Sequence, residues 1–303
     1  MKTLKLLYRD VDRTPYLYTL KHAAEKYDLE LDMEKASGPQ YGEHLESGRA
    51  DVLAENYWGL QSFAARGVPF FSVASSVTWM NETLLVHPSI STVDDLKGKK
   101  FAVRKIGPSE ILPGLWLKDM RLDKDVEQMP VSEAEVGRWG NWKKVLEGEC
   151  HGCFVTNLYA DEPLQAGLKS LPFERYGILG NVTLTVSGRM IDSNRKDVQN
   201  LVNAAFDATR IFRNDRSTTL KIMGREAREL LKVESSEKLE RFYEILKDEL
   251  SEIPIPSAEA IANTLRMRLD RSPELASFNP LLMWDFSFIR EALKNQPPRP
   301  SVA

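Results

Sequence analysis

The sequence predicts an α/β protein with doubly wound, mostly parallel sheets and a helical C-terminal extension. Short apolar runs alternate with amphipathic stretches over the first two thirds of the chain, a pattern typical of parallel sheets covered by helices. Residues 215–296 are instead highly charged and are predicted to be all helical, with one break at Pro254 and Pro256.

Composition excludes several classes of protein. The 303 residues are 42% hydrophobic, enough for one large core or two modest ones. A net charge of −3 gives no reason to expect a nucleic-acid partner, and no stretch reaches the length of a membrane span. The N-terminal apolar run is only a few residues long before Arg9 and Asp10, and no cleavage site is visible. We therefore expect a cytoplasmic protein, or a periplasmic or other extracytoplasmic one if a signal peptide was removed.

Four strands are predicted before Trp79, each a short apolar run: residues 4–8, 29–33, 51–53 and 68–74. Between the first two, Thr14 can cap a helix that has Pro15 at its first position. Residues 79–87 are predicted to be extended. Four further strands follow, at residues 101–103, 126–129, 152–155 and 182–187, and a long amphipathic helix begins near Arg195.

The stretch from Ile90 to Ile111 organises the second half of this pattern. Asp94 and Asp95 can cap a helical turn that Gly98 ends, and a buried strand follows. Residues 107–109, G-P-S, then break the chain before an apolar helix. A strand, a glycine turn and a helix start leave backbone N–H groups unpaired, which suits an anion, although an ordinary βα loop would have the same pattern.

Three segments in order resemble the type II periplasmic-binding-protein-like fold, in its sulfonate, taurine and pyrimidine-precursor branch. They are T-V-D-D-L-K-G-K-K-F-A-V (residues 92–103), L-E-S-G-R-A-D (45–51) and W-K-K-V-L-E-G-E-C-H-G-C (142–153). The resemblance covers most of residues 1–215. It implies a first lobe of residues 1–85 and 188–303, including the helical tail, and a second lobe of residues 86–187. The chain would cross between the lobes near residues 80–87 and 182–188.

Ligands of such α/β sheets lie beyond the carboxyl ends of the strands, and the resemblance implies that two sets of these ends face one cleft. The loops there hold two arginines, several hydroxyls, an amide and aromatic rings, which is a suitable set for a small, aromatic organic acid. The predicted ligand-binding residues are Asp10, Arg13, Tyr57, Trp58, Ser76, Thr78, Arg104, Ser109, Glu110, Asn157 and Tyr159. The same residues could simply be solvated or act as caps, and no catalytic residue is identified.

Residues Asp12-Arg13-Thr14 also resemble the start of 4,5-dihydroxyphthalate decarboxylases, which are cytoplasmic enzymes of this fold. The histidine-bearing stretch of that family is missing, because residues 76–82 are S-V-T-W-M-N-E. This difference puts the particular decarboxylase activity in doubt, but not bond cleavage in general.

The motif C-H-G-C, from Cys150 to Cys153, is not expected to bind a metal. A structural zinc site needs four ligands, and Cys153 fits a buried strand that Cys150 precedes. The pyrimidine-precursor synthases carry an iron motif further along the chain, but residues 180–186 contain no cysteine. We predict no metal and no other cofactor.

Two functions follow from these observations. The first is a cytoplasmic enzyme, of decarboxylase or lyase type, that binds and cleaves a small organic acid between the lobes. The alternative is a non-catalytic solute-binding protein that delivers an organic anion, sulfonate or pyrimidine-type ligand to the permease of an ABC transporter. A homo-oligomer is compatible with either function.

Overall fold

The computed structural model describes residues 1–36, 41–55, 59–105, 108–174 and 176–295. The chain divides into two compact units, which we call lobe 1 (Met1–Trp79 and Gly177–Ala303) and lobe 2 (Met80–Tyr176). The sequence places these divisions later, at residues 85/86 and 187/188. Strand pairing explains both differences, as described below for each lobe.

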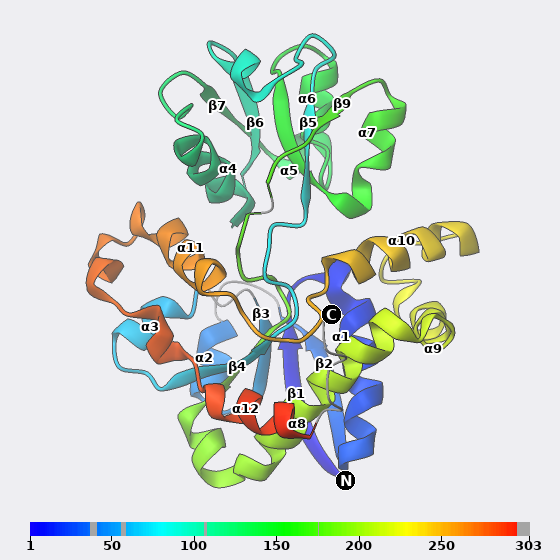
Figure 1. Ribbon diagram of the computed structural model, residues 1–303, viewed down its shortest axis with the longest axis vertical. Helices are drawn as coiled ribbons and strands as arrows, with labels where there is room; N and C mark the ends of the chain where they lie inside the picture. Colours follow the sequence, from blue (N-terminus) through cyan, green and yellow to red (C-terminus); the bar gives the residue numbers. More distant parts are fainter. Residues whose placement is uncertain (37–40, 56–58, 106–107, 175, 296–303) are drawn as a thin grey trace, which may run out of the picture. The chain divides into compact units, whose positions relative to one another are not determined.

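Lobe 1 contains a five-stranded mixed sheet of order β2-β1-β3-β10-β4 (Figure 1). The strands are β1 (Lys2–Tyr8), β2 (Leu29–Lys35), β3 (Val52–Glu55), β4 (Phe70–Ser75) and β10 (Thr183–Ser187). β1 runs parallel to β2 and β3, whereas β10 is antiparallel to both of its neighbours. The strand at residues 182–187, which the sequence assigns to the second lobe, therefore belongs to the sheet of lobe 1.

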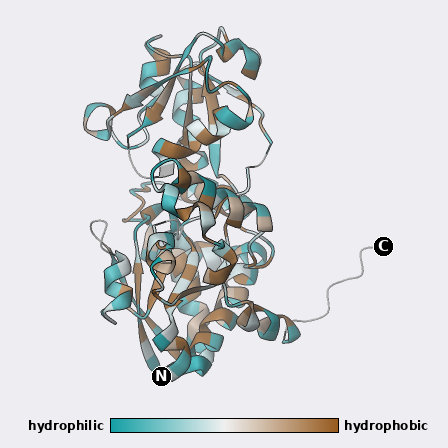
Figure 2. Cartoon of the chain, turned by 90° about the vertical axis from the view of Figure 1, so that its left-hand side faces the viewer, coloured by the Kyte–Doolittle hydropathy of each residue, from teal (hydrophilic) through white to brown (hydrophobic). Residues whose placement is uncertain are grey.

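Helices cover the sheet of lobe 1 and form its core together with the strands. They are α1 (Thr14–Ala24), α2 (Tyr41–Glu46), α3 (Gln61–Ala65) and α8 (Gly188–Asn214). α1 packs along α8, while α2 and α3 contribute to a core cluster around Leu7, Leu53 and Phe70. Apolar residues, brown in Figure 2, alternate with hydrophilic ones along the helices, and the buried residues of the strands and helices are mostly apolar. The alternation of strands and helices in the sequence thus becomes a sheet in which β3, β4 and β10 are buried on both faces, whereas β2 alternates between buried and exposed residues.

The C-terminal extension of lobe 1 is helical, as predicted. It comprises α9 (Arg216–Ile222), a π-helical turn (Met223–Ala227), α10 (Ser236–Glu249), α11 (Ala258–Leu269) and α12 (Phe286–Lys294). The break between α10 and α11 contains Pro254, whose carbonyl oxygen accepts from the N–H of Ser75 at 3.0 Å. α12 packs against α8 and β4. The hydrogen bond between Ser75 and Pro254 brings the segment after α10 to the carboxyl end of β4.

Lobe 2 contains a second mixed sheet, of order β7-β6-β8-β5-β9. The strands are β5 (Glu82–Val86), β6 (Lys100–Arg104), β7 (Glu127–Val131), β8 (Gly152–Thr156) and β9 (Lys169–Leu171). β6 is parallel to β7 and β8, and β5 is antiparallel to β8 and β9. Because β5 pairs along its whole length inside this sheet, lobe 2 begins at Met80 rather than at residue 86.

The helices of lobe 2 are α4 (Pro108–Asp119), α5 (Glu133–Val136), α6 (Trp142–Leu146) and α7 (Asp161–Gln165). The turn before β6 has a capping box, in which Thr92 and Asp95 each bond the other's backbone, and Gly98 has a positive φ of 71°. The rings of Phe101, Trp116 and Phe154 pack together in the core. Within the described part of the chain, no helix is both long and apolar enough to cross a membrane.

Candidate functional site

The carboxyl ends of β1, β3 and β4 meet at one edge of the lobe 1 sheet. The three strands point the same way because β10 is antiparallel to both β3 and β4. Asp10 and Arg13 follow β1, whereas Ser76 and Thr78 follow β4. The structure thus brings these four predicted residues to one edge of the sheet. The predicted Tyr57 and Trp58 lie outside the described residues.

Arg13 is buried and already paired. Its side chain is 5% exposed, and its guanidinium forms an ion pair and hydrogen bond with the carboxylate of Glu249, at the end of α10. The Oδ2 atom of Asp10 lies 3.9 Å from Arg13 Nε. Burial by itself lowers the pKa of Arg13, but the carboxylates of Glu249, Asp10 and Asp12 outweigh it and raise the pKa. Arg13 therefore bonds within the protein in this structure.

The hydroxyl groups at this edge also have partners inside lobe 1. Ser76 Oγ lies 2.5 Å from the hydroxyl of Tyr16, which in turn lies 3.2 Å from Thr209 Oγ1. Burial raises the pKa of Tyr16, so its phenol stays protonated. Thr78 Oγ1 lies 3.1 Å from Ser251 Oγ. These contacts form a preorganised polar layer rather than a set of free donors.

Asp10 caps a turn, as one of the interpretations of the sequence expects. Its carboxylate accepts from the N–H of Asp12 at 3.1 Å and from Nδ2 of Asn181 at 2.9 Å. Asn181 lies just before β10, so this contact links two chain segments at the same edge.

Arg104 ends β6 in lobe 2 and is 8% exposed. Its guanidinium donates to Ser109 Oγ at 3.1 Å and forms an ion pair with Glu133. The guanidinium carbon lies 3.5 Å from the ring centroid of Trp139, so the two planar groups stack. Arg104 and Ser109, both predicted from the sequence, are therefore in direct contact.

Two buried donors of this stack have no partner among the described residues: Arg104 Nε and Trp139 Nε1. Trp139 also has a positive φ of 57°, a strained conformation for a bulky side chain. An unpartnered buried donor costs free energy unless a water or a ligand accepts from it. A strained backbone beside buried donors that lack a partner is typical of a ligand-binding site.

The remaining predicted residues of lobe 2 lie at the same carboxyl edge. Glu110 is in the first turn of α4, next to Ser109. Asn157 and Tyr159 form the turn after β8, and Asn157 Oδ1 accepts from Thr83 Oγ1 at 2.8 Å. Tyr159 packs against the core cluster that contains Trp142 and Cys153. Asn157 and Tyr159 thus contact other residues of lobe 2, and their binding of a ligand stays a prediction.

Both cysteines are buried and unbridged. Burial raises the pKa of Cys150 to about 12 and that of Cys153 well above its usual value. Within the described part of the chain, no group of three or more histidine, cysteine or acidic side chains is placed to hold a metal. Absence of a bound metal in the purified protein stays a prediction.

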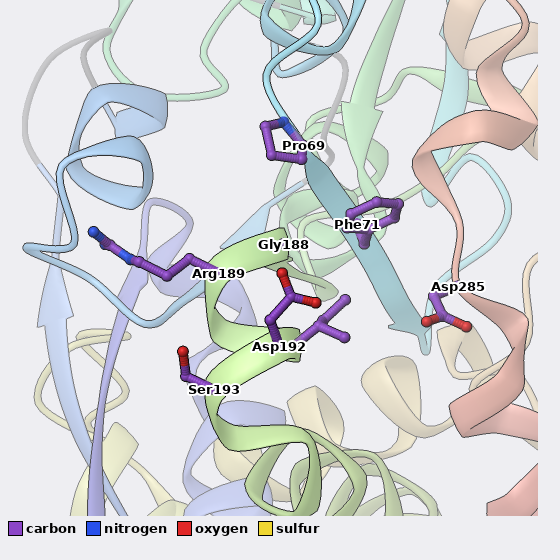
Figure 3. Close-up of a pocket in the computed structure, with 8 residues that line it drawn as sticks. Pro69, Phe71, Gly188, Arg189, Asp192, Ser193 and Asp285 are labelled. Carbon is purple, nitrogen blue, oxygen red and sulfur yellow. The ribbon is translucent and has the colours of Figure 1, made fainter.

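A cavity of about 530 Å³ lies elsewhere in lobe 1, against the first turns of α8 (Figure 3). Its lining consists of Pro69, Phe71, Gly188, Arg189, Ile191, Asp192, Ser193 and Asp285. Because β4 begins at Phe70, this cavity lies at the amino end of that strand, opposite the edge that carries Arg13. None of the described site residues predicted from the sequence lines it.

Three residues that matter at these edges were not predicted. Glu249 belongs to a helix remote in sequence, and nothing in its neighbourhood points to Arg13. Glu133 is one of many acidic residues in the sequence, and its surroundings predict an exposed side chain like most of the others. For Trp139 the sequence did contain a signal of a functional residue, because a tryptophan between Gly137 and Gly140 is unusual in a polar loop.

No protein-family model and no curated protein matches this sequence. Solved structures do match it in fold. One is a periplasmic sulfonate-binding protein, SsuA, from Methylobacillus flagellatus KT, with 16% identity over 100% of this chain and 99% of the other, at a TM-score of 0.73. The periplasmic aliphatic sulphonate-binding protein SsuA of Escherichia coli shares 16% identity over 95% and 99% of the two chains, at a TM-score of 0.69.

The desulfurization enzyme DSZB is similar as well, with 16% identity, coverage of 97% of this chain and 99% of that one, and a TM-score of 0.63. Identities this low establish the fold alone, and the matches include both binding proteins and an enzyme. The resemblance predicted from the three sequence segments is confirmed: this chain has the type II periplasmic-binding-protein-like fold, shared with the sulfonate-binding proteins.

Proposed function

We propose that this protein is a solute-binding protein for a small organic acid, and that Arg104 and Trp139 of lobe 2 hold its carboxylate or sulfonate group. The observation that carries this proposal is the pair of buried, unpartnered donors, Arg104 Nε and Trp139 Nε1. They belong to two neighbouring side chains, because the guanidinium carbon of Arg104 lies 3.5 Å from the ring centroid of Trp139. An acid group has several oxygens, and in this proposal it accepts from both donors.

The chemistry of this pair favours an anion over a neutral ligand. Arginine stays protonated at any physiological pH, and its hydrogen bonds to carboxylates and sulfonates are charge-assisted. Each such bond contributes on the order of 1.5–3 kcal/mol. The guanidinium already has one acidic neighbour, Glu133, whose side chain is 32% exposed and therefore partly screened by water. A ligand acid would complete the guanidinium's hydrogen bonds without displacing Ser109.

The comparisons support delivery to a transporter as the purpose of binding. Two of the similar structures are described as periplasmic sulfonate-binding proteins, one of them of an ABC transporter. By analogy we propose an extracytoplasmic location and a transporter permease as partner. Nothing in the comparisons supports the cytoplasmic location expected from the sequence.

Calorimetric titration with benzenesulfonate and benzoate tests the proposal. We expect Arg104→Ala to weaken binding roughly ten- to a hundredfold, and Arg104→Lys to recover only part, because lysine keeps the charge but not the planar fork. Lys105→Ala is the matched control, since Lys105 is the adjacent cation and is exposed. Equal affinity in Arg104→Ala and Lys105→Ala would exclude Arg104 from the site.

A second candidate is an enzyme that cleaves the bound acid. In its favour stands the similarity to a desulfurization enzyme, and the Asp12-Arg13-Thr14 resemblance to decarboxylases. Mass spectrometry of each acid before and after incubation with the protein separates the two functions. A binding protein returns the acid intact, whereas an enzyme releases carbon dioxide or a sulfur oxyanion in proportion to time.

A further inference from the structure

Lobe 1 carries an acid of its own at the place where a ligand acid was expected. Glu249 is the last residue of α10, and its side chain is only 3% exposed. It meets Arg13, which is 236 residues away in sequence, at the carboxyl end of β1. Both charges are thus withdrawn from water and compensate each other.

The segment that carries Glu249 is firmly attached. The N–H of Ser251 donates to the carbonyl oxygen of Ser76 at 2.8 Å, and Ser251 Oγ lies 3.1 Å from Thr78 Oγ1. Nη1 of Arg213 donates to the carbonyl oxygen of Leu250 at 2.6 Å. Because the backbone on the C-terminal side of Glu249 is fixed in this way, its carboxylate is delivered to Arg13 without the entropy loss that a free acid would suffer.

The contact between the two side chains is that of a bound ligand. A carboxylate accepts from a buried guanidinium, beside a preorganised layer of hydroxyls that includes Tyr16 and Ser76. An external acid would find the same donor, but only in competition with an acid already in place.

We propose that Glu249 is an internal ligand, which fills a carboxylate-binding position built around Arg13, and that this position accepts an external carboxylate only when Glu249 is absent. This inference concerns lobe 1 alone and goes beyond the proposed function, in which Arg104 of lobe 2 binds the acid of the natural ligand.

The test is thermal unfolding of the full chain with acetate as the probe. Glu249→Ala removes one methylene and the carboxylate, which together match the size of acetate. At about 0.1 M, acetate should raise the unfolding temperature of Glu249→Ala by about 2–4 °C more than it raises that of the wild type, both measured against chloride. Arg13→Met/Glu249→Ala should lose this excess, and Glu252→Ala, an exposed neighbour, should behave like the wild type.

Two outcomes would overturn the proposal: no excess stabilisation of folded Glu249→Ala by acetate, or equal stabilisation by neutral acetamide, which would indicate that only a void is filled. If Glu249→Ala does not fold in chloride, refolding is repeated in acetate. Recovery there supports the internal ligand, and failure in both salts counts against it. Arg104→Ala in the Glu249→Ala background should keep the excess, so this result is independent of the proposed site in lobe 2.

Discussion

The two thiols of lobe 2 illustrate how burial controls the chemistry of a single residue. Burial first, and then the nearby Glu149, raise the pKa of Cys150 from 9.0 to about 12. Only thiolates react readily, so we expect iodoacetamide to label neither cysteine of the native protein at pH 8 and both after unfolding. Mass spectrometry counts the labels. Rapid labelling of the native protein would show that the thiols are accessible and activated.

The same raised pKa gives a dependence of stability on pH. The neutral thiol of Cys150 is favoured in the folded state, so its stabilising contribution is complete below the unfolded value of about 9 and falls as the pH rises toward about 12. Denaturant unfolding at several alkaline pH values measures the decline. Cys150→Ala should show less of it, because alanine does not ionise.

Residue-level prediction from the sequence succeeded where the neighbours in space are also neighbours along the chain. Arg104 and Ser109 are close in sequence, and the predicted strand, turn and helix between them bring the two side chains together. Arg13 lies after the end of the first strand, as predicted, but its ion-pair partner Glu249 could not be predicted from the sequence. Glu249 reaches it through the packing of a whole helix, which no local pattern records.

At the scale of elements, strand β10 is held between β3 and β4 in the lobe 1 sheet by hydroxyl pairs as well as by its backbone. Ser72 Oγ and Thr185 Oγ1, both fully buried, lie 2.8 Å apart. We expect Ser72→Ala or Thr185→Val alone to cost about 1–3 kcal/mol of unfolding free energy, because each leaves one buried hydroxyl without its partner. The double variant should cost clearly less than the sum, since both hydroxyls are then gone.

Denaturant unfolding of the wild type, the two single variants and the double variant gives the coupling free energy between the two hydroxyls. A strictly additive double variant would mean that the hydroxyls do not depend on each other. The pair Ser75 and Thr183, also 2.8 Å apart, is less suitable, because Ser75 Oγ has a second acceptor in the carbonyl oxygen of Val77.

Elements with a strong apolar period were predicted well. The sequence did not, however, predict correctly to which lobe the strand at residues 182–187 belongs. The strands at residues 4–8, 29–33 and 101–103 match β1, β2 and β6. β10 has an equally clear pattern, but whether it pairs with β3 or with strands of lobe 2 depends on contacts distant in sequence. β9 was missed because its three residues are mostly exposed and show no alternation.

At the scale of the whole molecule, lobe 2 has a sheet and a core of its own. It is one continuous segment, and the chain enters and leaves it at neighbouring positions. The N–H of Met80 donates to the carbonyl oxygen of Tyr176 at 2.7 Å, so the ends of this unit meet. Units whose termini are adjacent and whose core is self-contained can fold alone. Residues 80–176 include all five strands from β5 to β9, and the ring of Trp116 lies 5.1 Å from that of Phe154 in their core.

We therefore expect a fragment of residues 80–176 to fold by itself, with a near-ultraviolet circular dichroism signal from its packed tryptophans and a single cooperative thermal transition. Its stability should be on the order of 5 kcal/mol, as is usual for a domain of this size. The matched control is a fragment of residues 86–187, the second lobe predicted from the sequence. That fragment loses β5, which pairs with both β8 and β9, and gains β10, whose partners are in lobe 1. It should lack the cooperative transition, and equal folding of both fragments would contradict the division at Met80 and Tyr176.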